Sequence, residues 1–142
     1  MNLLLDQSVL QVGLGESGLA CARWALAQGA RLTVIDTRET PPGLQELQSI
    51  QPDVRVINSV GDLNWDFNRV VVSPGLPPSH PLMVAVLAHA ADHSTSVDSE
   101  LDLFADALQA LQQSRNYKPQ VVGITGTNGK TTTTRMVECL AQ

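Results

Sequence analysis

The chain has 142 residues, of which 43% are hydrophobic and 16% charged, and its formal net charge is −5. This length suits one domain, and the composition is that of globular rather than disordered proteins. The acidic balance argues against binding to nucleic acid or to an anionic membrane, because both need a basic surface. No apolar run approaches the ~20 residues of a membrane span and no secretion signal is evident, so we expect a cytoplasmic protein.

Short apolar runs alternate with stretches of helical periodicity, a pattern typical of βα units on a parallel sheet. The predicted strands cover residues 8–12, 31–35, 54–57, 69–72 and 94–97. The predicted helices cover residues 16–28, 44–50, 80–91 and 98–112. We therefore expect residues 1–97 to form an α/β domain with a Rossmann-like parallel sheet flanked by helices.

The remainder of the chain changes character after this domain. Residues 98–118 are predicted to be a helix followed by a polar linker. Residues 120–124 read as a new strand, which leads into a glycine-rich loop and a helix from about residue 129. We expect residues 119–142 to be the first strand, phosphate-binding loop and helix of an incomplete ATPase domain, most of which would lie beyond this chain.

A first candidate phosphate site is the string Gly-Leu-Gly-Glu-Ser-Gly at residues 13–18, between a predicted strand and a predicted helix. In the G-x-G-x-x-G pattern, Gly13 allows a tight turn, Gly15 a close approach by ligand, and Gly18 close helix packing. The N–H groups at the helix start can then face a diphosphate. Asp36 ends the second strand, where dinucleotide enzymes hold a ribose. These residues alone predict a nucleotide site, NAD included, or a tight turn.

A second candidate site is the glycine-rich turn before Lys130. Its spacing differs from the strict Walker pattern, because Ile124 stands where a glycine is expected. The Lys130 ammonium can reach β- and γ-phosphates while loop N–H groups surround them, and the Thr131 hydroxyl can contact Mg²⁺. We predict Lys130 as a catalytic residue and Thr131 as the metal contact. The predicted ATP-binding residues are Gly126, Thr127, Asn128, Gly129, Lys130, Thr131 and Thr132.

The loop at residues 126–132 resembles the ATP loop of the Mur ligase family, ATP-dependent enzymes that form amide bonds in peptidoglycan synthesis. Three further segments resemble the members that add D-glutamate to UDP-N-acetylmuramoyl-L-alanine, namely residues 13–18, Asp36-Thr37-Arg38 and Ser73-Pro74-Gly75. The resemblance covers the whole chain, roughly the first third of such an enzyme. It implies that the first domain binds the UDP part of a substrate rather than NAD.

The resemblance also implies a role for individual residues in UDP-substrate binding. These residues are Gly15, Glu16, Ser17, Gly18, Asp36, Thr37, Arg38, Ser73, Pro74 and Gly75. The helix start would meet the diphosphate, with Glu16 contributing its backbone N–H because its carboxylate would repel phosphate. Asp36, Thr37 and Arg38 would line the uridine site, and Gly75 would lie against the uracil ring.

The reaction that the resemblance implies uses ATP, Mg²⁺, D-glutamate and UDP-N-acetylmuramoyl-L-alanine, and we expect a monomer. In the family's layout the D-glutamate and second metal sites lie beyond residue 142, so this chain by itself is expected to be inactive. Two alternatives remain. An NAD-dependent oxidoreductase would use residues 13–18 but leaves residues 126–132 unexplained. A stand-alone nucleotide-binding module would bind without catalysis.

Overall fold

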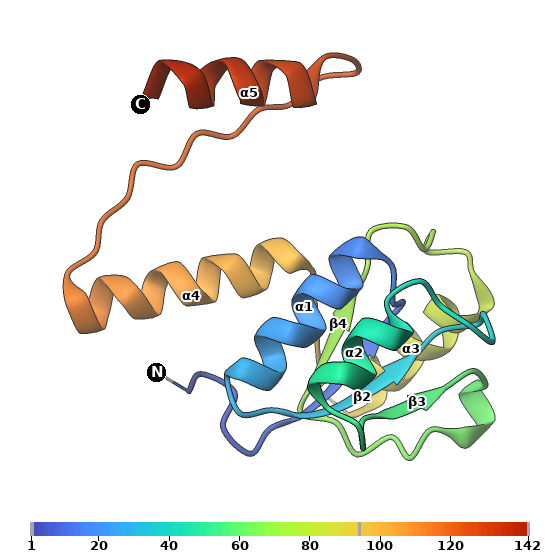
Figure 1. Cartoon of the computed structure of the whole chain (residues 1–142). Helices are drawn as coiled ribbons and strands as arrows, with labels where there is room; N and C mark the ends of the chain where they lie inside the picture. Colours follow the sequence, from blue (N-terminus) through green and yellow to red (C-terminus); the bar gives the residue numbers. More distant parts are fainter. Residues whose placement is uncertain (1, 94, 142) are drawn as a thin grey trace.

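The computed structural model describes residues 2–93 and 95–141 and contains a five-stranded sheet with helices on both faces (Figure 1). The strands are β1 (Ser8–Val12), β2 (Arg31–Ile35), β3 (Arg55–Ile57), β4 (Arg69–Val72) and β5 (Ser96–Asp98). The helices are α1 (Glu16–Ala27), α2 (Leu44–Ile50), α3 (Pro81–His93), α4 (Glu100–Arg115), α5 (Lys130–Ala141) and the short 3-10 helix η1 (Val60–Asp62).

The sheet has the strand order β3-β2-β1-β4-β5, and every neighbouring pair is parallel. In the centre, Leu10 of β1 lies opposite Thr33 of β2 on one side and Val70 of β4 on the other. The chain winds from β1 outward to β3 and then returns to the other side of β1 for β4 and β5. The winding therefore reverses between β1 and β4, and the predicted α/β fold with a Rossmann-like sheet is confirmed.

Two apolar cores lie on the two faces of the sheet, because successive side chains of a strand point to opposite faces. Helices α1, α2 and α4 cover one face, and α3 covers the other. The first core contains Val9, Ala22, Val34, Leu47 and Leu103, all buried. The second core contains Leu10, Val12, Ile35, Leu82 and Val86, also buried. Helices thus cover both faces of the sheet, so the ends of the strands are the part of the sheet left open to a ligand.

The region around α4 differs in its boundaries from the prediction. The helix begins at Glu100 rather than at residue 98, because Ser99 forms a capping box with Asp102, whose carboxylate accepts the Ser99 backbone N–H at 2.7 Å. It continues to Arg115, into the segment predicted as linker, and ends at Asn116, whose φ of 51° is left-handed. Strand β5 covers Ser96–Asp98, while Ser94, the predicted first residue of that strand, lies outside the described residues.

The segment after α4 leaves the body of the protein in extended form, and α5 stands apart from the sheet (Figure 1). The strand predicted at residues 120–124 is not formed, since a strand needs a neighbouring backbone to pair with. Val121 and Val122 are instead 63% and 69% exposed. The predicted helix is present as α5, which has no buried side chain among its described residues.

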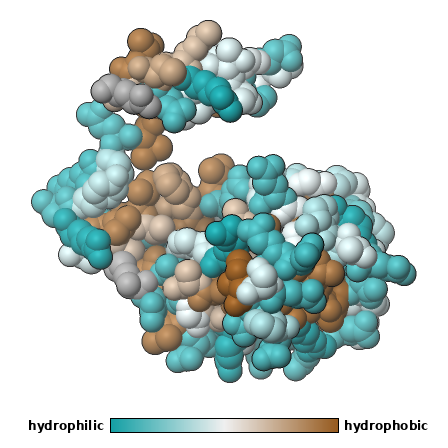
Figure 2. Space-filling view, viewed as in Figure 1, coloured by the Kyte–Doolittle hydropathy of each residue, from teal (hydrophilic) through white to brown (hydrophobic). Residues whose placement is uncertain are grey.

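Apolar residues also gather on the surface over α4 (Figure 2). Leu101 and Phe104 of this helix are 71% and 52% exposed.

Within residues 2–93 and 95–141, no helix is both long and apolar enough to cross a membrane.

Candidate nucleotide site at the carboxyl ends of the strands

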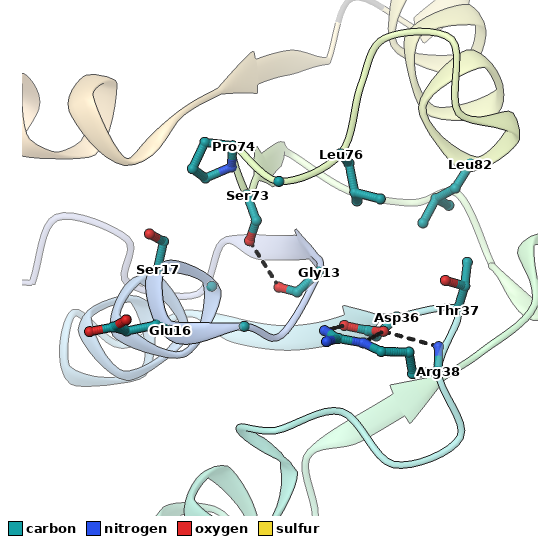
Figure 3. A pocket seen from close by; sticks show the side chains of 13 residues that line it. Gly13, Glu16, Ser17, Asp36, Thr37, Arg38, Ser73, Pro74, Leu76 and Leu82 are labelled. Carbon is teal, nitrogen blue, oxygen red and sulfur yellow. Dashed lines mark hydrogen bonds and ion pairs between the residues drawn. The ribbon is translucent and has the colours of Figure 1, made fainter. Parts of the chain in front are cut away.

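A cavity of about 450 Å³ opens beyond the carboxyl ends of β1, β2 and β4 (Figure 3). It lies where the winding of the sheet reverses, the position at which open α/β sheets bind ligands. All ten residues predicted to bind the UDP substrate line this cavity, together with Gly13, Leu76 and Leu82. The structure therefore brings together three segments that are far apart in the sequence, and their binding role stays a prediction.

The glycine loop forms the floor of this cavity and needs glycine at two places. Gly13 has a φ of 85°, a left-handed conformation that side chains disfavour. A Cβ on Gly18 would collide with the Gly13 carbonyl and lie 2.6 Å from the Ser73 hydroxyl oxygen. Gly15 is the N-cap of α1, and no side chain caps the helix there. The first turn of α1 therefore presents backbone N–H groups to the cavity, an arrangement that favours anions.

Asp36 follows β2 and is buried beneath the cavity, with its side chain 3% exposed. One carboxylate oxygen accepts the Leu14 backbone N–H at 2.7 Å and an Arg38 side-chain N–H at 2.7 Å. The other oxygen accepts the Arg38 backbone N–H at 3.0 Å and its Nε–H at 2.9 Å. The carboxylate thus ties the loop after β2 to the glycine loop.

The ionisation of Asp36 is set by competing effects. Burial alone raises its pKa, but the hydrogen bonds from the Arg38 side chain and from the Leu14 and Arg38 backbone outweigh burial and lower the pKa to about 2. The same pairing raises the pKa of Arg38. Both groups are charged at neutral pH. The Arg38 guanidinium remains 52% exposed at the cavity rim, so it is available to a ligand there.

Ser73 follows β4 and turns its side chain toward the glycine loop. Its hydroxyl donates to the Gly13 carbonyl at 3.1 Å, a contact drawn in Figure 3. The same hydroxyl accepts a hydrogen bond from the Gln11 side-chain amide at 3.2 Å. Pro74 and Gly75 are exposed at the rim of the cavity.

Sequence reasoning missed three contributors to this site. Leu76 and Leu82 form part of the cavity wall, and nothing in their sequence context distinguishes them from other core leucines. Gln11 does not line the cavity but bonds to residues that do. A polar residue inside the apolar run of β1 was a signal that could have revealed it.

The predicted ATP loop lies outside this cavity, between the extended segment and α5. Gly129 has a φ of 78°, so the turn into α5 requires the glycine. The Lys130 ammonium donates to the Gly126 carbonyl at 2.7 Å. The loop thus places an ammonium group and backbone N–H groups, which can donate to phosphate oxygens, at a helix start. The Thr131 hydroxyl stands at the same helix start and offers an oxygen of the kind that Mg²⁺ prefers.

Solved structures with a similar fold include dehydrogenases and reductases. The acetophenone reductase of Geotrichum candidum in complex with NAD matches with a TM-score of 0.51 and 17% identity, over 96% of this chain and 47% of that one. The shikimate dehydrogenase of Aquifex aeolicus matches with a TM-score of 0.51 and 14% identity, over 82% of this chain and 51% of that one. At this identity the likeness shows the fold alone.

Curated relatives with much higher identity carry the name UDP-N-acetylmuramoylalanine–D-glutamate ligase. The protein of Burkholderia vietnamiensis is 47% identical over 94% of this chain, and that of Ralstonia nicotianae is 45% identical over 98%. The chain spans 27% and 28% of the length of these relatives. The family described as Mur ligase MurD-like, N-terminal domain, matches residues 7–94. This chain therefore belongs to the MurD-like branch of the Mur ligases, through the domain that holds the cavity.

Proposed function

We propose that this chain binds the UDP part of UDP-N-acetylmuramoyl-L-alanine and is the front part of an ATP-dependent ligase that adds D-glutamate to it in peptidoglycan synthesis. The observation that carries the proposal is the convergence of all ten predicted UDP-site residues on one cavity. The names of the curated relatives support the substrate class.

The start of α1 suits the diphosphate of such a substrate. The backbone N–H groups of Glu16, Ser17 and Gly18 stand at the positive end of the helix dipole and beside the cavity. Glu16 is exposed, and its carboxylate would repel a phosphate, so we assign the contact to its N–H. The absence of a Cβ at Gly15 leaves room for close approach by the phosphates.

The loop after β2 suits the uridine. Two side-chain N–H groups of Arg38 bind Asp36, and the guanidinium carries further N–H donors that can face a ligand while this pair stays intact. Asp36 already has donors on both carboxylate oxygens. We therefore assign Asp36 a positioning role, in which its carboxylate holds Arg38 and the glycine loop in place. Thr37 and Gly75 also line the cavity, and we assign them to the uracil site.

We further propose that residues 126–132 hold the phosphates of ATP. The Lys130 ammonium already lies against the loop carbonyl of Gly126, close to where β- and γ-phosphates would bind. The reaction would begin with attack of the substrate carboxylate on the γ-phosphate, which gives an acyl phosphate and ADP. The amine of D-glutamate would then displace phosphate.

In that reaction, Lys130 would stabilise the charge on the transferred phosphoryl group. Thr131 would hold Mg²⁺, which offsets phosphate charge when bound. We place the reaction in the cytoplasm, with a monomeric enzyme and small-molecule substrates.

Calorimetric titration of the 142-residue chain with UDP-N-acetylmuramoyl-L-alanine, UDP and NAD tests the binding site. We expect both uridine compounds to bind at least tenfold more tightly than NAD. Arg38→Ala should weaken UDP binding by about tenfold or more, because a hydrogen bond to a charged group contributes about 1.5–3 kcal/mol and about 1.4 kcal/mol corresponds to tenfold. Arg23→Ala is the matched control, since Arg23 is 56% exposed and pairs with Glu46 outside the cavity. Binding of NAD in preference to UDP would refute the proposal.

A further inference from the structure

A buried glutamine lies in the central strand of the sheet. Gln11 of β1 is 1% exposed, and its strand neighbours Leu10 and Val12 are apolar and fully buried. Burying an amide side chain is unfavourable unless its polar atoms find hydrogen-bond partners. The positions of these partners therefore show which parts of the structure the glutamine holds together.

The Gln11 side-chain nitrogen lies 3.1 Å from the Gly13 carbonyl oxygen and 3.2 Å from the Ser73 hydroxyl oxygen. A carbonyl oxygen can only accept, so the contact with Gly13 fixes which end of the amide faces the loops. The Ser73 hydroxyl donates its own hydrogen to the same Gly13 carbonyl at 3.1 Å. The three groups form a closed set of hydrogen bonds, which we call the Gln11 network.

The Gln11 network joins two loops that line the cavity from different strands. Gly13 begins the loop after β1, and Ser73 begins the loop after β4. The first turn of α1 packs directly on these groups, because a Cβ on Gly18 would lie 2.6 Å from the Ser73 hydroxyl oxygen. The network thus lies where the glycine loop meets the loop after β4, and its hydrogen bonds link the two loops.

We propose that Gln11 is a positioning residue of the UDP site: its amide holds the glycine loop and the Ser73 loop in the spacing that a ligand spanning both requires. This inference rests on the proposed function. The Ser73 hydroxyl is hydrogen-bonded within the network, so Ser73 affects the ligand indirectly, by holding Gly13 in position. Ligands that contact both loops depend on this spacing, whereas smaller ligands do not.

The test compares UDP with uridine, because the glycine loop would bind the diphosphate that uridine lacks. Gln11→Met removes the amide donors at nearly constant volume, and we expect it to weaken UDP binding by about 5- to 10-fold, the effect of roughly one buried hydrogen bond. Uridine binding, measured by NMR titration, should change by less than about 2-fold. The double variant Gln11→Met/Ser73→Ala should lose no more UDP affinity than the weaker-binding single variant, because both changes act on one network.

Val9→Ala is the matched control, since Val9 is fully buried on the same face of β1 but belongs to the core. We expect it to lower the melting temperature and leave UDP affinity unchanged. Ser73→Ala alone keeps the test valid should Gln11→Met fail to fold, because Ser73 is only half-buried. Unchanged UDP affinity in Gln11→Met and Ser73→Ala, or an equal loss for uridine and UDP, would overturn the inference while leaving the proposed function in place. A wild-type chain that binds no UDP would refute the proposed function itself.

Discussion

The buried carboxylate of Asp36 makes a quantitative prediction about stability. Its pKa falls from 3.8 to about 2, and its side chain is 3% exposed. Since each pKa unit corresponds to about 1.4 kcal/mol, the ionised carboxylate stabilises the fold by roughly 2 kcal/mol at neutral pH. Asp36→Asn removes the charge and turns an amide toward N–H donors. We therefore expect the free energy of unfolding to fall by about 2 kcal/mol at pH 7.

The pH dependence identifies the cause of this loss. The folded state has the lower pKa, so the stabilisation is present above pH 3.8 and is lost as the pH falls toward 2. The difference between wild type and Asp36→Asn should be nearly constant from pH 7 to pH 5 and should shrink to about half near pH 3. Urea unfolding followed by circular dichroism measures it, with the exposed Asp53→Asn as control. A difference that stays the same at pH 5 and pH 3 would show that charge is not its origin.

Two further predictions concern the glycine loop and the end of the chain. Gly18→Ala should lower the free energy of unfolding by about 1–3 kcal/mol, measured by urea titration, because the added Cβ would collide with the Gly13 carbonyl. Gly75→Ala is the control: its added Cβ would meet open space, so the free energy of unfolding should fall by less than about 0.5 kcal/mol. Removal of residues 120–142 should shift the melting temperature by less than about 2 °C, since α5 buries no side chain among its described residues. A similar cost for both alanine variants, or a larger drop on truncation, would contradict these expectations.

Much of the fold was predictable because local signals and tertiary structure agree. The bounds of β1, β2, β4 and α2 match the predicted ranges. A glycine or proline follows β1, β4 and α2 within two residues, and Asp36 follows β2. The start of α4 was misplaced, although Ser99 and Asp102 carry the capping-box spacing that marks it. The strand predicted at residues 120–124 failed for another reason, because strand propensity alone supplies no pairing partner.

The site was predictable at the level of segments but not of hydrogen bonds. Motif spacing pointed to the glycine loop and Asp36, and the family resemblance added Thr37, Arg38, Ser73, Pro74 and Gly75. All of these residues line one cavity, and their binding role awaits experiment. The pairing of Arg38 with Asp36 depends on side-chain rotamers that no spacing rule contains. Gln11 and Ser73 are 62 positions apart, and their contact follows only once β4 is placed beside β1.

The reversal of winding between β1 and β4 has a consequence for the order of folding. The unit β1-α1-β2 can form from sequence-local contacts as soon as about the first 35 residues are available, including the glycine loop. The hydrogen bond between Ser73 and Gly13 spans 60 positions, so the cavity closes only after β4 has crossed to the far side of β1. During synthesis the ribosome must therefore deliver more than seventy residues before the nascent chain can form the complete cavity.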